Sequence, residues 1–182
     1  IHLGLVDAGV LQRLERRFRV KLQAGLVRHD ADLVRFVRAN DGNKALAAEQ
    51  LKILTKGGQL TPFVLYPYQQ KLHARMEAQR KRFGFIRQVW LKNRQIGTST
   101  LVQGRLFHRT TLWPYTNALV VAHNDQIAQK IFLMTRHFYD NLAPALRPMV
   151  RYDTKSELVF ENPGMDRAAN PGLMSRIEVA TA

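Results

Sequence analysis

One stretch decides the fold: residues 91–100, which read LKNRQIGTST. An apolar run at 85–91 precedes it, and we expect this run to form a largely buried strand. A run at 99–111 with helical spacing follows it. A strand, a short loop and a helix in this order can hold phosphate, because the loop N–H groups and the positive end of the helix dipole face the anion. The stretch therefore predicts a phosphate-binding loop in an α/β domain.

The loop departs from the standard pattern G-x-x-x-x-G-K-[ST] at two positions. Lys92 occupies the first glycine position, and Thr98 stands where the lysine is usual. We expect Lys92 to fold back over the loop and reach the phosphates from the other side. Gly97 can take backbone angles that a side chain would forbid, and Ser99 or Thr100 stands where a hydroxyl would bind Mg²⁺. The alternative is an ordinary strand-to-helix turn.

The residues on both sides of the loop alternate between strand and helix patterns. Residues 61–67 are extended and apolar, and Pro67 fits the first position of a helix that closes at Gly84. Residues 118–122 form a continuous apolar run, as expected of a strand covered on both faces. An amphipathic helix is expected at 125–142, and further strands are expected at 158–160 and 177–179. This alternation predicts a mostly parallel sheet flanked by helices.

Residues 1–59 have a different pattern and predict a helical N-terminal region. Amphipathic stretches begin near residues 7 and 30, and a third covers 45–54 and ends at Gly57-Gly58. No cofactor motif occurs there, so a helical appendage or docking surface is expected. The second region, 60–182, is expected to be a partial nucleotide-binding domain. Both ends of the chain look cut, which suggests part of a longer polypeptide.

Composition restricts the class of protein. The chain has 182 residues, no cysteine and a formal net charge of +14. The absence of cysteine excludes disulfides and thiolate metal sites. The charge favours polyanionic partners, although a solvated basic surface is the alternative. No apolar run approaches the length of a membrane span, residues 1–7 lack the pattern expected of a signal peptide, and the histidines lack the spacing of metal ligands.

A family resemblance rests on Arg94-Gln95-Ile96-Gly97-x-Ser99. This run resembles the Arg-Gln-x-Gly-x-Ser/Thr core of large terminase subunits, the P-loop ATPases that pump DNA into tailed-phage and herpesvirus capsids. Some members of that family carry the lysine at the start of the loop, as Lys92 does here. The resemblance covers the chain from about residue 60 to its end. It implies a P-loop NTPase-type sheet flanked by helices, with ATP and Mg²⁺ as cofactors.

The resemblance also implies an adenine-recognition element upstream of the loop. In this family the element is an aromatic residue followed by glutamine at a helix start, which Tyr68-Gln69 matches. A glutamine amide can accept from N6 and donate to N7 of adenine. Gln69 is the first choice for contact with adenine, and Gln70 is the second. The alternative is a helix N-terminus whose glutamines face solvent and bind no nucleotide. The implied ATP-binding residues are Tyr68, Gln69, Lys92, Asn93, Arg94, Gln95, Ile96, Gly97, Thr98, Ser99 and Thr100, with Ser99 also binding Mg²⁺.

The implied activity is ATP hydrolysis that drives double-stranded DNA into a capsid. The family's acidic Walker B motif should follow the strand at 175–182, so we assign no catalytic carboxylate in this chain, which alone should be inactive. His123 and Asn124 follow the strand at 118–122, where a capping or exposed role is favoured over DNA contact or ATP coupling. The implied partners are double-stranded DNA, a small terminase subunit and the capsid portal, with a homo-oligomeric ring when assembled and no membrane. The implied location is the host cell cytoplasm, with docking at the portal vertex.

Two rival interpretations remain open. A superfamily 2 helicase-like translocase has a glutamine element, a phosphate loop and a following strand in the same order. A basic nucleic-acid-binding or assembly module without catalysis would instead use the helices at 7–60.

Overall fold

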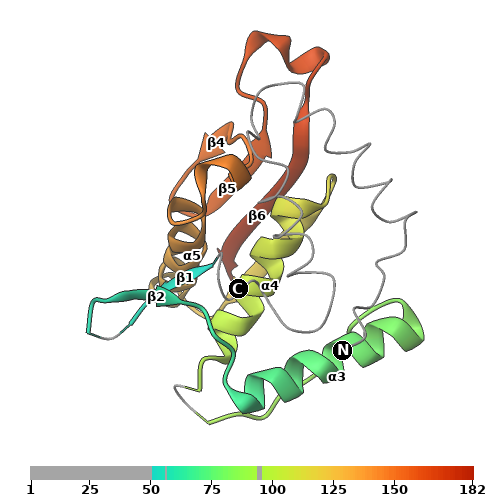
Figure 1. Ribbon diagram of the computed structural model, residues 1–182, viewed down its shortest axis with the longest axis vertical. Helices are drawn as coiled ribbons and strands as arrows, with labels where there is room; N and C mark the ends of the chain where they lie inside the picture. Colours follow the sequence, from blue (N-terminus) through green and yellow to red (C-terminus); the bar gives the residue numbers. More distant parts are fainter. Residues whose placement is uncertain (1–50, 56, 94–95) are drawn as a thin grey trace, which may run out of the picture.

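The computed structural model describes residues 51–182 except residues 56, 94 and 95, so the helices expected at 7–50 lie outside the described residues. The described part is a mixed α/β structure (Figure 1). Its elements in chain order are β1 (Lys52–Leu54), β2 (Leu60–Pro62), α3 (Pro67–Phe83), α4 (Thr98–Leu112), β3 (Asn117–Ala122), α5 (Asp125–Asp140), η1 (Pro144–Leu146), β4 (Tyr152–Asp153), β5 (Glu157–Glu161), η2 (Met165–Ala168) and β6 (Gly172–Thr181). No helix among the described residues is long and apolar enough to cross a membrane.

The four-stranded sheet is mixed, and the expectation of a mostly parallel sheet is wrong. The strand order is β3-β6-β5-β4, and β3 pairs with β6 in parallel. Both other pairings, β4 with β5 and β5 with β6, are antiparallel. The reason is the link between β5 and β6: residues 162–171 contain a 3₁₀ turn but no crossover helix, and a parallel connection needs about a dozen residues or more.

Helices α4 and α5 lie together on one face of this sheet, and both pack against β6 (Figure 1). The strand expected at 118–122 is confirmed as β3, but its expected coverage on both faces is wrong. Ala118 and Ala122 are buried, whereas Leu119 is 60% exposed and Val121 is 57% exposed. Because alternate side chains of a strand point to opposite faces, β3 buries one face only in the described part of the chain.

The run at 85–91, expected to be a buried strand, is not one. It has no regular secondary structure, and Val89 and Leu91 are fully exposed. The cause is a contact with α3, in which the Gln79 side chain hydrogen-bonds to both the N–H and the carbonyl of Arg87. The Arg87 N–H donates to Gln79 Oε1 at 3.0 Å, and Gln79 Nε2 donates to the Arg87 carbonyl at 3.0 Å. The segment therefore runs back along α3 instead of pairing in the sheet.

The N-terminal end of the described chain is a hairpin that packs on α5. The helix expected at 45–54 is wrong for its last residues, because Lys52–Leu54 pairs antiparallel with Leu60–Pro62 across the expected boundary at residue 60. A turn at Gly57-Gly58 joins the two strands. Gly58 has a φ of 79°, and the Thr55 N–H donates to the Gln59 carbonyl at 2.8 Å.

Helix α3 begins and ends where the sequence predicts. Pro67 is its first residue, where a missing N–H costs no helical hydrogen bond. Gly84 ends it with a φ of 78°, and the Gly84 N–H donates to the Arg80 carbonyl at 2.8 Å. The expected helices at 99–111 and 125–142 are likewise confirmed as α4 and α5.

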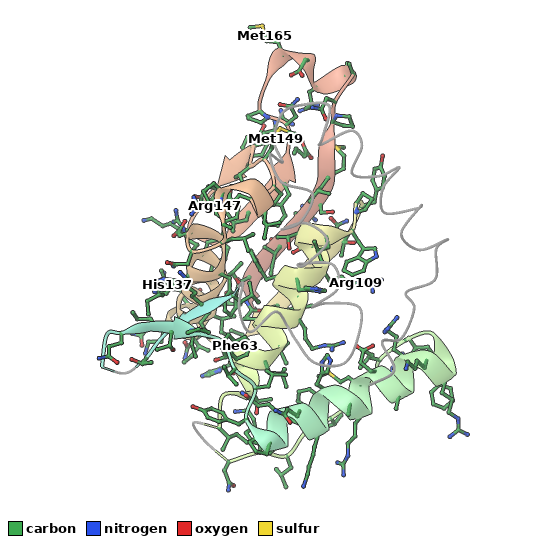
Figure 2. All side chains as sticks on the ribbon, in the orientation of Figure 1. Phe63, Arg109, His137, Arg147, Met149 and Met165 are labelled. Carbon is green, nitrogen blue, oxygen red and sulfur yellow. The ribbon has the colours of Figure 1, made fainter. Side chains whose placement is uncertain are left out.

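A chain of phenylalanines joins the hairpin, the helices and the sheet. The ring centroids of Phe63 and Phe138 are 6.0 Å apart, those of Phe138 and Phe107 5.7 Å, and those of Phe107 and Phe160 6.5 Å. Figure 2 labels Phe63 beside the first half of α4. A Cβ on Gly104 would come within 3.0 Å of the Phe63 ring, so the hairpin packs closely on α4. Each buried ring stabilises the fold by roughly 1.5–3 kcal/mol.

Candidate nucleotide-binding site

The site begins at the N-terminus of α4. Gly97 precedes the helix in the left-handed conformation, with φ 69° and ψ 17°. The first N–H groups of any helix lack an intrahelical partner. In α4 no side chain of the described residues caps them, and the first turn holds no acidic residue. In α5, by contrast, Asn124 Oδ1 accepts from the Ile127 N–H at 2.9 Å, and Asp125 lies in the first turn. The positive end of α4 is therefore suited to an external anion.

The start of α3 lies against this loop, although 28 residues separate the two in sequence. Gln69 Nε2 donates to the Gly97 carbonyl at 2.9 Å. The hydroxyls of Tyr68 and Thr98 lie 3.4 Å apart. The structure thus brings together two predicted elements, Tyr68-Gln69 and the Gly97 end of the loop.

Gln69 is nearly inaccessible, at 1% exposed. Its Oε1 accepts from the Tyr66 N–H at 2.9 Å, and its Nε2 holds the Gly97 carbonyl. Both ends of the amide therefore have protein partners. The alternate, Gln70, is exposed and donates to the Leu65 carbonyl at 3.0 Å. The assignment of either amide to adenine stays a prediction.

The three hydroxyls at the start of α4 differ in their surroundings. Thr98 is 4% exposed and faces Tyr68. Thr100 Oγ1 donates to Met134 Sδ at 3.6 Å. Ser99 is exposed to solvent. Of the two candidates for a metal-binding hydroxyl, Ser99 is therefore the accessible one, and its position fits the group that would hold Mg²⁺ in a nucleotide complex.

Of the two predicted cations, the structure describes Lys92 alone. Lys92 and Asn93 are exposed, and Ile96 is half-buried. Arg94 and Gln95 lie outside the described residues. The phosphate roles of the two cations therefore remain predictions.

Sequence reasoning missed a charged cluster that fastens α3 to α4. Arg105 donates to Glu77 Oε1 at 2.7 Å, and it also contacts His73 Nδ1. Arg80 donates to the other oxygen of Glu77 at 2.6 Å. Burial alone would raise the pKa of Glu77, but the hydrogen bonds and charges of Arg105 and Arg80 outweigh it and lower the pKa to about 2. No motif signals this cluster, because Glu77 and Arg105 lie on separate helices.

Two histidines border the same interface. Burial, followed by the charge of Arg105, lowers the pKa of His73 below its ordinary value. Burial and then the charges of Arg105 and Arg109 lower the pKa of His108 to about 4. Both imidazoles are therefore neutral at pH 7, so the charges in this interface are those of the arginines and Glu77.

The acidic side chains on the strands form ion pairs with arginines. Glu161 contacts Arg151 at 3.0 Å, and Glu157 contacts Arg176 at 3.6 Å. Glu178 also reaches Arg176, at 4.0 Å. Among the described residues, no group of three or more His, Asp or Glu side chains could hold a metal ion.

The residues after β3 have ordinary structural roles. Asn124 caps α5, and His123 is exposed. This arrangement agrees with the capping or exposed role that the sequence favours for the pair.

No protein-family model matches the chain, and no curated protein matches it. A functional assignment therefore depends on the local chemistry of residues 66–100 and on the charge of the chain.

Proposed function

We propose that this chain is the ATP-binding part of a viral DNA-packaging terminase large subunit, in which ATP hydrolysis drives double-stranded DNA translocation into the capsid. One observation carries the proposal: an uncapped helix N-terminus, preceded by a left-handed glycine, lies in hydrogen-bond contact with the start of α3. The free N–H groups of the helix would hold the phosphates, and the contact with α3 brings Tyr68-Gln69 beside them. Residues 85–91 do not form the strand that precedes the loop in a standard P-loop.

The residues of the loop would have different roles in nucleotide binding. The N–H groups at the start of α4 would donate to phosphate oxygens, and Ser99 would hold Mg²⁺ through its hydroxyl. Lys92 and Arg94 would neutralise the β- and γ-phosphates from the other side of the loop. Mg²⁺ would offset the charge of the transferred phosphate group.

The wider assembly belongs to the same proposal. A net charge of +14 supports a polyanionic partner, for which double-stranded DNA is the natural candidate. A small terminase subunit, a capsid portal and a ring of identical chains would complete the motor. It would work in the host cell cytoplasm, docked at the portal vertex.

The test is calorimetric binding of a non-hydrolysable ATP analogue with Mg²⁺ to the full chain and to two variants, Lys92→Ala and Arg94→Ala. Each variant should weaken binding by about tenfold or more, because a charge-assisted contact to phosphate is lost. Arg109→Ala is the control: it removes the same charge from the far end of α4, where Arg109 lies over the Trp113 ring (Figure 2). If both loop variants bind as tightly as the parent, the loop does not bind phosphate.

A further inference from the structure

We propose that Gln69 positions the phosphate loop and does not read the base, so that the site binds nucleoside triphosphates with little preference among purines. This inference rests on the proposed function and adds its specificity. The feature that carries it is the amide of Gln69, held at both ends between α3 and the loop.

The amide of Gln69 is already engaged by the protein. Reading adenine requires one carbonyl oxygen to accept and one N–H to donate at the same time. Here Oε1 accepts from the Tyr66 N–H, Nε2 donates to the Gly97 carbonyl, and the residue is 1% exposed. The amide keeps a second lone pair on Oε1 and a second N–H on Nε2, but a base could reach them only if this buried side chain moved. That movement would leave the Tyr66 N–H and the Gly97 carbonyl without these partners.

The contact with Gly97 fixes the geometry of the loop. The Gly97 carbonyl also accepts from the Leu101 N–H at 3.0 Å, which is the first helical hydrogen bond of α4. Two donors therefore hold one carbonyl and set the peptide plane that leads into Thr98. A Cβ at residue 97 would come within 2.7 Å of Gln69 Nε2, so the contact needs glycine there. Gln69 thus acts through the loop backbone and is a positioning residue.

Among the described residues, two tyrosines at the start of α3 offer aromatic rings that can contact a base without identifying it. Tyr66 is 64% exposed directly before α3. Tyr68 is half-buried, and its hydroxyl lies 3.4 Å from the Thr98 hydroxyl. Stacking of a base on an aromatic ring tolerates any base, because every base has a π-face. Recognition would then come from the triphosphate, with an aromatic surface that accepts adenine or guanine.

The experiment measures the affinity of the full chain with Mg²⁺ for three probes: non-hydrolysable analogues of ATP and GTP, and inorganic tripolyphosphate. We expect the parent to bind the two nucleotides with dissociation constants within about threefold of each other. Gln69→Ala should weaken all three probes by about tenfold or more and leave the ATP to GTP ratio unchanged, because the loop and not the base is affected. Gln129→Ala, which removes an exposed amide from α5, should change none of them.

Two outcomes would show that Gln69 reads adenine and does not position the loop. A parent that prefers the ATP analogue by about tenfold or more would overturn the inference, and so would a Gln69→Ala variant that loses adenine preference but keeps its tripolyphosphate affinity. The parent measurement needs no variant, so it stands even if Gln69→Ala fails to fold. Failure of the parent to bind any of the three probes would overturn the proposed function itself.

Discussion

Gly97 is the residue on which the site depends, because three requirements meet at its backbone. Its φ of 69° lies in the left-handed region, its carbonyl accepts from Gln69 and from Leu101, and its peptide leads directly into α4. A residue with a side chain would be strained in this conformation and would also collide with the Gln69 amide.

We predict that Gly97→Ala lowers both stability and nucleotide affinity. The left-handed conformation costs an alanine about 1–2 kcal/mol, which thermal or urea unfolding would measure. The displaced Gln69 contact should weaken binding of an ATP analogue by about tenfold or more. The matched control is Gly58→Ala, at a φ of 79° with nothing within 4 Å of the added Cβ. It should cost similar stability and leave affinity unchanged; equal losses of affinity in both variants would contradict the role of Gly97.

The chemistry of single residues was the part of the site most open to prediction from sequence. The glycine, the exposed serine and the proline at the start of α3 follow from rules about backbone angles and helix ends, and they occupy the expected positions. The double engagement of Gln69 could not be predicted, because it depends on how α3 and α4 approach each other.

At the scale of elements, polar contacts join α3 to α4, and Met76 of α3 adds an apolar contact with the core. Glu77 joins Arg105 of α4 to Arg80 of its own helix, and Gln69 and Tyr68 add the contacts at the other end of α3. Figure 1 shows α3 lying away from the sheet, with the start of α4 beside its N-terminal end. The ion pairs of Glu77 therefore help to orient α3, and Gln69 links that orientation to the loop.

We predict that Glu77→Gln loosens α3 and destabilises the protein by about 1 kcal/mol at neutral pH, since the pair is partly solvated. Because the pKa of Glu77 falls from 4.5 to about 2 on folding, its contribution is complete above pH 4.5 and is lost as the pH falls toward 2. The difference in unfolding free energy between parent and variant should therefore shrink over that interval. Urea titrations at several pH values measure it; a difference that stays constant down to pH 2 would contradict this role.

The limits of sequence prediction are clearest for the strands. Helices α3, α4 and α5 were predictable because their apolar spacing, proline and glycine signals agree. The run at 85–91 has the composition of a buried strand, yet Gln79 binds the backbone of Arg87 and holds the run beside α3. The direction of strand pairing could not be predicted from the sequence either, because the apolar pattern of β5 and β6 is the same for parallel and antiparallel pairing.

At the scale of the whole molecule, the charge favours a polyanionic partner for the proposed motor and equally for a basic module without catalysis. The net charge is +14, and the carboxylates of Glu157, Glu161 and Glu178 are paired with arginines. Binding to duplex DNA should weaken by at least roughly tenfold between 50 and 200 mM salt, as counterion release requires. This salt dependence is common to both interpretations.

We predict that an ATP analogue changes the affinity of the chain for duplex DNA at constant salt, because a motor couples its nucleotide site to its DNA site. The measurement is fluorescence anisotropy of a labelled duplex with and without the analogue, and Lys92→Ala should abolish the difference. Salt-sensitive binding that ignores nucleotide would favour the basic module.

The most direct test of the central claim is an amide NMR titration of the isotope-labelled 182-residue chain with a non-hydrolysable ATP analogue and Mg²⁺. If α4 receives the phosphates, the largest shifts will fall on the N–H groups of Gly97, Thr98, Ser99 and Thr100, and inorganic tripolyphosphate will reproduce them. Saturable binding whose shifts leave these four amides unmoved would contradict the assignment of residues 92–99 as a phosphate loop.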